Sequence, residues 1–209
     1  MKNTKKYLSL LLVLVLVLAL AACGNAPAAE ESASAKAGGW TIPEDAAVSD
    51  EARAAFEKAM EGLTGVSYQP VALVGTQLVS GTNYCILCEA RVVYPDAVPY
   101  YALVYVYADL QGGAKILNIA ILDIGDIAET GEVKAAEAAP QALMGGWSVD
   151  RDSKLQVEGS LLHLASQVVN GTNHCFLCEG CKLAFVYESL DGKTELKNTV
   201  TLDLGALRG

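Results

Sequence analysis

The sequence predicts an α+β fold dominated by antiparallel β-sheet, present as one complete copy and one truncated copy. Three observations predict it. A 16-residue segment recurs later in the chain with nine residues unchanged. Segments rich in β-branched and aromatic residues alternate with Gly and Pro, as strands joined by hairpin turns do. One stretch with apolar residues at helical spacing precedes these segments in the first copy. We therefore expect an antiparallel β-sheet packed on one helix, followed by a truncated, β-rich second copy.

The repeat is direct. GTQLVSGTNYCILCEA (residues 75–90) returns as ASQVVNGTNHCFLCEG (residues 165–180) at an offset of 90, and VYADLQGG returns as VYESLDGK at an offset of 80. Gly38 and Gln77 are 39 residues apart, whereas Gly145 and Gln167 are only 22 apart. The second copy therefore lacks 17 residues near its start. The change of offset from 90 to 80 shows that a further 10 residues are missing from its middle.

The N-terminal segment has the pattern of an export signal. Lys2, Lys5 and Lys6 precede an apolar stretch over residues 8–20, which is short for a membrane span. Residues 20–24, LAACG, resemble the bacterial lipobox, in which the cysteine is lipidated after cleavage just before it. We predict a lipoprotein signal peptide over residues 1–22 and lipidation at Cys23, so that the protein is exported and anchored by this lipid to the extracytoplasmic face of a bacterial membrane.

The segment after the signal is predicted to be a flexible tether. Residues 23–37 are small and polar and bury too little apolar surface to fold. The whole chain has a net charge of −9, and removing the three lysines of the signal makes it −12. Such a charge repels phosphate backbones and anionic lipid headgroups, which excludes nucleic acid as a partner.

The first copy, residues 38–125, begins with a short extended segment and a helix. Ser49 is placed to cap the helix, with Asp50 and Glu51 in its first turn. Apolar residues then recur at helical spacing up to Leu63. Four strands in hairpin order follow, predicted over residues 71–79, 84–93, 100–110 and 116–124.

Residues 126–144 are predicted to link the copies. An alternative is that residues 132–144 form a helix serving the second copy, which lacks one, although Pro140 argues against it. The second copy, residues 145–209, is expected either to lean on the first copy or to borrow this surrogate helix, because an uncovered sheet face is unstable alone.

The segment QLVSGTNY (residues 77–84) resembles the cystatin and stefin family, whose first inhibitory hairpin has the pattern QxVxG, often followed by TNY. QVVNGTN (residues 167–173) repeats it, and a glycine pair precedes each occurrence. The order of glycine pair, helix and hairpin strands over residues 38–125 is similar to that of the family.

The resemblance implies inhibition of papain-like cysteine proteases by a wedge made of a glycine segment and two hairpin turns. It implies no catalytic residue, no metal and no cofactor, so we expect no enzyme. The protease-contact residues that it implies are Gly38, Gly39, Gln77, Leu78, Val79, Ser80, Gly81, Gly112 and Gly113. The second-copy equivalents are Gly145, Gly146, Gln167, Val168, Val169, Asn170 and Gly171.

One departure from the family concerns the second hairpin. The family commonly carries a bulky apolar residue there, whereas the expected turn of this chain is Gln111, Gly112, Gly113 and Ala114. The second hairpin, one leg of the wedge, is therefore expected to be bare of apolar contact residues. This expectation favours the alternative hypothesis of a non-inhibitory scaffold or ligand-binding module that keeps the fold at the cell surface.

The cysteines form two CxxC pairs, Cys85 with Cys88 and Cys175 with Cys178, and Cys181 follows. Residues three apart in a strand point to opposite faces, with Cα atoms about 10 Å apart, which suits neither a disulfide within the pair nor one metal ion. We expect buried thiols or thiols bonded elsewhere. His163 and His174 are expected to be strand residues rather than catalytic bases.

Overall fold

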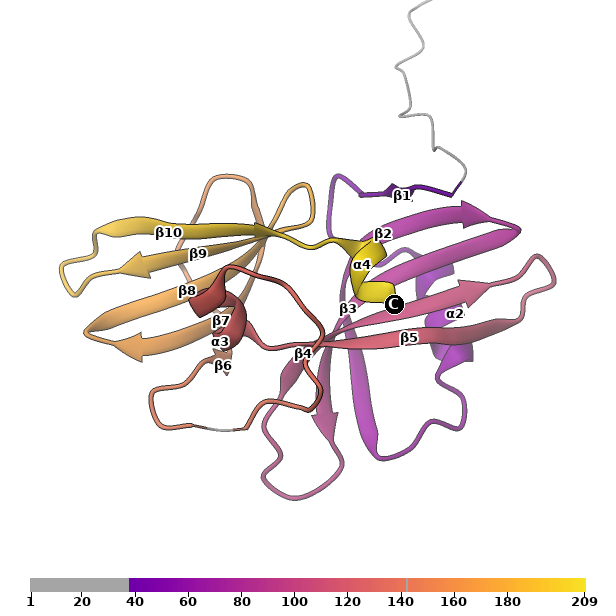
Figure 1. The fold of residues 1–209 in the computed structure, drawn as a ribbon, viewed down its shortest axis with the longest axis horizontal. Helices are drawn as coiled ribbons and strands as arrows, with labels where there is room; N and C mark the ends of the chain where they lie inside the picture. Colours follow the sequence, from indigo (N-terminus) through magenta and orange to yellow (C-terminus); the bar gives the residue numbers. More distant parts are fainter. Residues whose placement is uncertain (1–37, 142) are drawn as a thin grey trace, which may run out of the picture. The chain divides into compact units, whose positions relative to one another are not determined.

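The structure, a computed structural model, describes residues 38–141 and 143–209, which fold as two five-stranded antiparallel sheets with three helices (Figure 1). The predicted signal peptide (residues 1–22), Cys23 and the tether (residues 23–37) lie outside the described residues. None of the described helices has the length and apolar character needed to cross a membrane.

Both sheets are meanders in which each strand pairs with the next. The first comprises β1 (Trp40–Thr41), β2 (Val66–Val79), β3 (Gly81–Val92), β4 (Tyr100–Ala108) and β5 (Ala114–Leu122). The second comprises β6 (Ser148–Val149), β7 (Ser160–Val169), β8 (Gly171–Cys178), β9 (Lys182–Glu188) and β10 (Thr194–Thr201). The helices are α2 (Asp50–Ala59), α3 (Ile124–Thr130) and α4 (Leu204–Arg208).

The predicted helix is present as α2 and covers one face of the first sheet. Ser49 caps it, its hydroxyl accepting a hydrogen bond from the Ala52 amide at 3.2 Å. Ala52, Ala55 and Phe56 are buried against the sheet. The helix ends at Ala59, before the apolar pattern does, because the chain then turns through glycines with positive φ at residues 62 and 65.

The four predicted strands are present in the predicted order, with different ends. β2 begins at Val66 and contains Pro70. β1 pairs only with Gln77 and Thr76, so the rest of β2 is a sheet edge, where a residue without an amide hydrogen is tolerated. β4 ends at Ala108, two residues earlier than expected, and β5 gives way to α3 at Ile124.

The two sheets share their irregularities as well as their order. The register of β2 on β3 shifts between Leu73 and Gly75, and that of β7 on β8 shifts between His163 and Ala165, at the repeat offset of 90. A bulge bends the strand that carries it and increases its twist. The truncated copy therefore retains the curvature of the complete one.

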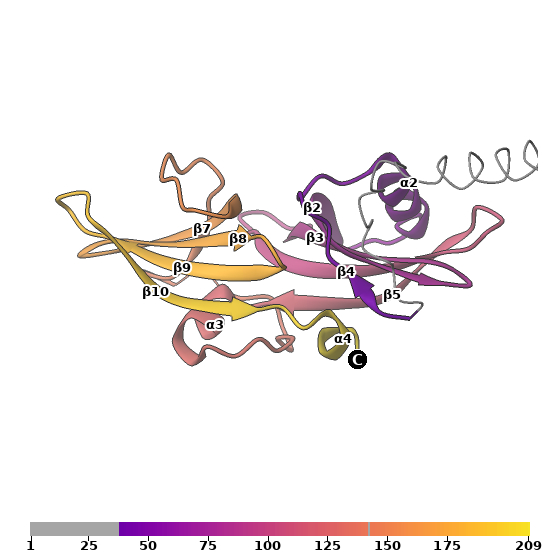
Figure 2. The ribbon, with the colours of Figure 1, turned by 90° about the horizontal axis from the view of Figure 1, so that it is seen from above.

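α3 and α4 were not expected from the sequence, and each follows the last strand of its copy. Asp123 caps α3 and Asp203 caps α4, in each case by accepting hydrogen bonds from two backbone amides. Both helices carry buried apolar residues in the same core cluster. In Figure 2 they lie on the side of the sheets opposite to α2.

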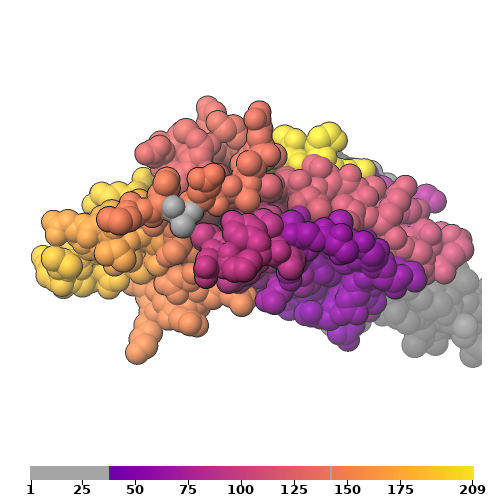
Figure 3. Space-filling view, turned by 90° about the horizontal axis from the view of Figure 1, so that it is seen from below, coloured from indigo at the N-terminus to yellow at the C-terminus, as the bar shows by residue number. Residues whose placement is uncertain are grey.

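α4 packs on the sheet of the other copy. The Asn118 amide of β5 donates to the Leu207 carbonyl at 3.1 Å, and a Cβ on Gly75 of β2 would collide with Leu204. Figure 3 shows the yellow C-terminal residues beside the pink residues of the first copy. In the same way, α3 ends beside β10, since a Cβ on Gly131 would lie 3.2 Å from the side-chain nitrogen of Asn198. We call this arrangement the helix exchange.

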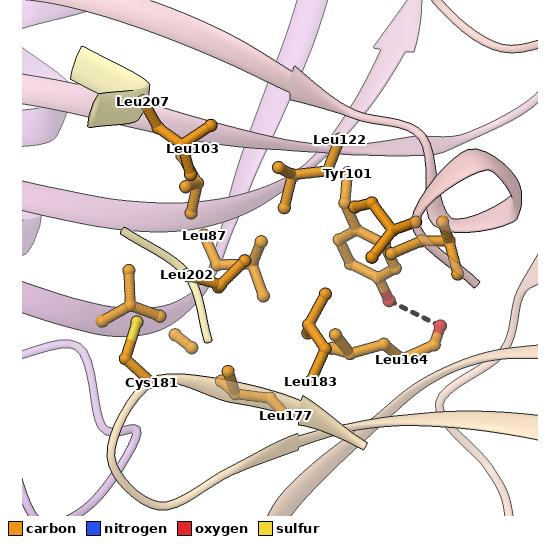
Figure 4. Packing of buried hydrophobic residues seen from close by; sticks show 14 of the residues in the cluster. Leu87, Tyr101, Leu103, Leu122, Leu164, Leu177, Cys181, Leu183, Leu202 and Leu207 are labelled. Carbon is orange, nitrogen blue, oxygen red and sulfur yellow. Dashed lines mark hydrogen bonds between the residues drawn. The ribbon is translucent and has the colours of Figure 1, made fainter. Parts of the chain in front are cut away.

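The faces of the two sheets that lie opposite α2 form one hydrophobic core with both exchanged helices. Figure 4 shows side chains of this shared core from both copies, among them Leu87 and Leu103 of the first and Leu177 and Leu183 of the second. The Tyr101 hydroxyl donates to the Leu164 carbonyl at 2.8 Å across the boundary. Of the two arrangements expected for the second copy, the structure shows the first, in which it leans on the complete copy.

Among the described residues, the second sheet has no counterpart of α2. The described residues of 132–144 form no helix, and Ala136 instead makes an isolated bridge with Ile121. The segment over residues 150–159 lies on the side of the second sheet that corresponds to α2 (Figure 2). It is tied to the sheet by hydrogen bonds from the Asp150 amide to Leu164 and from the Glu179 amide to Gly159.

Candidate functional site

The glycine segment of the first copy is fixed to the end of β2. The Gly38 amide donates to the Leu78 carbonyl at 3.1 Å, and the Gln77 side chain donates to the Gly38 carbonyl at 2.8 Å. Asn83 donates in turn to the Gln77 side-chain oxygen at 2.6 Å. The glutamine of the QxVxG pattern thus holds the glycine segment beside the hairpin, while Gly38 and Gly39 stay exposed.

The β2–β3 turn is tight and needs its glycine. Gly81 has a φ of +122°, and a Cβ there would lie 2.3 Å from the Ala108 carbonyl oxygen. The Tyr107 hydroxyl of β4 donates to the Ser80 carbonyl at 2.5 Å. The turn is therefore held rigidly against the neighbouring hairpin, with Leu78 and Val79 exposed on it.

The β4–β5 turn runs from Asp109 to Gly113, closed by the Asp109 amide on the Gly113 carbonyl at 2.9 Å. The Asp109 carboxylate also accepts from the amides of Gln111 and Gly113. Because β4 ends at Ala108, Leu110 lies inside this turn, and it is 79% exposed. The second hairpin thus has an apolar residue, which corrects the expectation that this leg is bare.

These three segments lie together at one end of the first sheet. The register places the glycine segment next to Leu78, Thr82 opposite Ala108, and Ala108 opposite Ala114. We name residues 38–39, 77–81 and 109–113 the first tip. Every predicted contact residue of the first copy belongs to it.

The second copy repeats this arrangement. Gln167 donates to the Gly145 carbonyl at 2.9 Å, and Asn173 donates to Gln167 at 2.8 Å. Gly171 has a φ of +120°, and the Tyr187 hydroxyl donates to the Asn170 carbonyl. We name residues 145–146, 167–171 and 189–193 the second tip, which holds every predicted second-copy equivalent.

The turn of the second tip has an apolar residue too. Leu190 is 85% exposed in the turn from Ser189 to Lys193. Hydrogen bonds from Lys193, at 2.6 Å, and from Ser189 hold the pKa of Asp191 below its usual range, so this turn carries an ionised carboxylate beside its apolar residue. Sequence reasoning passed over Leu110 and Leu190, although the repeat places a leucine at both positions.

The two tips differ in one contact that crosses the helix exchange. Arg208 of α4 donates to the Gln77 side-chain oxygen at 3.1 Å, the same atom that accepts from Asn83. At the repeat offset of 80, α3 carries Ala128, which has no such group. The first tip is thus braced by the second copy.

The five cysteines of the described residues lie outside both tips and are free thiols. Cys85 faces the shared core, whereas Cys88 lies under α2, so the two residues of this pair point to opposite faces as expected. Burial raises the pKa of all five described thiols, for Cys181 to about 12. In the described residues no group of three His, Cys, Asp or Glu side chains is placed to hold a metal ion.

The two histidines lie in strands of the second sheet and bond to each other. His163 Nε2 is 3.1 Å from His174 Nδ1, and His174 Nε2 is 3.1 Å from a Glu188 carboxylate oxygen. An ionised Glu188 accepts from His174 Nε2, which leaves His174 Nδ1 to accept from His163 Nε2. His163 Nδ1 is then a buried acceptor without a partner among the described residues, and burial lowers the pKa of His163.

This histidine chain replaces apolar packing. At the repeat offset of 90, His163 corresponds to Leu73 and His174 to Tyr84, both packed near α2 in the first copy. The tips, in contrast, present mainly backbone and exposed apolar side chains, an arrangement suited to binding a protein surface. Comparison with known protein families, curated proteins and solved structures finds no match to this chain.

Proposed function

We propose that the chain is a lipid-anchored bacterial surface protein with a cystatin-like fold that inhibits papain-like cysteine proteases. One observation carries the proposal. The glycine segment and both hairpin turns of the first copy lie side by side at one exposed end of a single sheet. An inhibitory wedge needs this alignment, and a chain that used the fold only as a scaffold does not.

The chemistry of the first tip suits insertion into a cleft. Gly38 and Gly39 have no side chain, so their backbone can approach an enzyme wall closely. Leu78, Val79 and Leu110 provide exposed apolar surface on two turns. Hydrogen bonds from Gln77 and Tyr107 fix these segments before binding, so little conformational entropy is lost on association.

The fixed turn also explains how a peptide segment in a protease cleft avoids cleavage. The Ser80 carbonyl accepts from Tyr107, and Gly81 is packed against the backbone of β4. The turn cannot extend along an active site as a substrate does without breaking these contacts. We propose no catalytic step for the protein itself.

The alternative, a non-inhibitory scaffold or ligand-binding module at the cell surface, drew its support from the bare second hairpin. Leu110 supplies an apolar residue there, so that support is gone. We retain the alternative as an outcome of the test below.

The test is titration of papain activity with the chain from Gly24 to Gly209, which lacks the signal and the lipidated cysteine. We expect inhibition constants from nanomolar to micromolar. A variant carrying Asp at one apolar position of each turn on both tips should inhibit at least ~100-fold less, since buried contacts at an interface centre contribute about 2–4 kcal/mol each. Its substitutions are Leu78→Asp, Leu110→Asp, Val168→Asp and Leu190→Asp.

Exposed positions are preferable for this test. Gly81→Glu forces a side chain into the Ala108 carbonyl and damages the fold together with the tip. Val93→Asp is the matched control, because Val93 is 71% exposed just after β3, at the end of that strand remote from the tip. Absence of inhibition at high micromolar concentration moves the assignment to the scaffold.

A further inference from the structure

We propose that the protein is double-headed, with each tip binding one papain-like protease and both tips occupied at the same time. This rests on the function proposed for the first tip and assigns to the second, truncated copy a complete binding surface of its own.

The second tip has the same backbone frame as the first. In both, a glutamine donates to the glycine segment, an asparagine donates to that glutamine, and a tyrosine donates to the turn carbonyl. The φ of the turn glycine is +122° in one and +120° in the other. A protease cleft that accepts the backbone of the first tip therefore finds the same backbone conformation in the second tip.

Exposed apolar side chains are concentrated at both tips. In the part of the chain that the structure describes, 13 large apolar side chains are exposed, and eight of them belong to the tips or directly precede a glycine pair. The first tip has three, Leu78, Val79 and Leu110. The second also has three, Val168, Val169 and Leu190, and Leu143 and Met144 precede its glycine pair. A copy kept only as support for the first would not need them exposed.

The truncation removes nothing from the second tip. The counterpart of α2 is missing between Trp147 and β7, and its site on the sheet is the face that carries His163 and His174. The paired ends β6–β7, β7–β8 and β8–β9 keep the register of the first sheet at the tip. The deletion therefore removes the helix from the second copy and leaves the second tip intact.

The two tips point away from each other. In Figures 1 and 2 the β2–β3 and β4–β5 turns end one side of the pair of sheets, and the β7–β8 and β9–β10 turns end the other. The shared core and the helix exchange lie between them. A protease on one tip does not cover the other, so the occupant that fits the second tip is a second molecule of the same class of enzyme.

The test measures stoichiometry with papain whose active-site cysteine has been alkylated, so that binding is seen without turnover. The chain from Gly24 to Gly209 is mixed with excess alkylated papain, and the mass of the complex is determined by light scattering after size exclusion. Val168→Asp with Leu190→Asp disables the second tip, Leu78→Asp with Leu110→Asp disables the first, and Val93→Asp is the control. All five positions are exposed, so the fold is preserved.

We expect two papain molecules per chain for the unmodified protein and the control, one for each single-tip variant, and none when both tips are altered. One papain per chain that is lost only in the first-tip variant overturns the double-headed proposal and leaves inhibition by the first tip standing. No binding by any form overturns both. Chains that self-associate through the second tip, with papain bound only at the first, also overturn the double-headed proposal.

Discussion

Asn118 in β5 of the first copy donates its side-chain amide to the carbonyl of Leu207, 89 residues later in the chain. Its repeat counterpart, Asn198 in β10, lies beside Gly131 at the end of α3. α4 thus lies on the last strand of the first copy, and α3 ends beside the last strand of the second, so the folding of the two copies is linked through these helices.

Weakening the packing of α4 in the shared core should destabilise both sheets. Leu207 is buried in the shared core, and Leu207→Ala should lower the free energy of unfolding by about 2–4 kcal/mol. Urea unfolding followed by fluorescence and by circular dichroism measures it. Leu196→Ala, at an exposed position of β10, is the control and should change little. A Leu207→Ala protein as stable as the control would show that α4 contributes nothing to the core.

The first copy alone should not persist as a monomer. A fragment over residues 38–131 exposes the face that carries Leu87, Tyr101 and Leu103, which the second copy covers in the intact chain. We expect a homodimer in which each α3 takes the place of α4 on the partner's β5. Light scattering after size exclusion decides this, and a folded monomer at micromolar concentration would contradict it.

The turn glycines should differ sharply in their tolerance of alanine. Gly81→Ala meets the Ala108 carbonyl and requires a positive φ, and it should cost about 3 kcal/mol or more. Gly112→Ala is the matched case, with a positive φ but open space around the new Cβ, and it should cost only about 1 kcal/mol. Thermal unfolding of both variants gives the comparison. Equal losses would mean that the packing of the turn against β4 is unimportant.

Stability should fall as the pH drops below about 6.5. Burial lowers the pKa of His163, so the folded protein holds this imidazole neutral while the unfolded chain takes up a proton near pH 6.5. The contribution is fully present above that pH and is lost as the pH falls towards the folded pKa, with a slope of at most about 1.4 kcal/mol per pH unit for one proton.

The measurement is urea unfolding between pH 7.5 and pH 5. A double variant, His163→Leu with His174→Tyr, copies the residues of the first sheet at these positions and should flatten the dependence. If the double variant keeps the slope of the unmodified protein, other groups are responsible for it.

The buried thiols should react slowly and in a defined order. Cys178 is the one cysteine of the described part of the chain that is not fully buried, whereas the Cys85, Cys88, Cys175 and Cys181 thiols are buried. Burial raises the pKa of all five, so exposure decides the order. Brief alkylation at pH 8 followed by peptide mass spectrometry should find Cys178 labelled first. Early labelling of Cys85 would show that the shared core opens.

The sequence was most informative where a local rule acts. Ser49 followed by two acidic residues predicted the start of α2, and Gly81 in QxVxG predicted the β2–β3 turn, because capping and positive φ depend on the residues themselves. The helix exchange could not be predicted in this way. α3 and α4 have seven and five residues, too few to show helical periodicity.

Which sheet receives each helix was a separate difficulty. The segments around Asp123 and Asp203 are similar, and so are β5 and β10, so each helix could equally well pack on its own sheet as far as the sequence shows. The choice depends on the path of the chain in three dimensions. Leu110 was overlooked for a related reason, since an apolar residue at the end of a strand pattern is read as part of the strand until the turn is seen.

The helix exchange also determines how the protein behaves on dilution. In a dimer of separate chains, each partner helix is lost once the concentration drops below the dissociation constant. Here both helices belong to one chain, so each sheet meets its helix at an effective concentration on the order of millimolar, whatever the amount of protein in solution. A single molecule in a large volume therefore keeps both of its sheets covered.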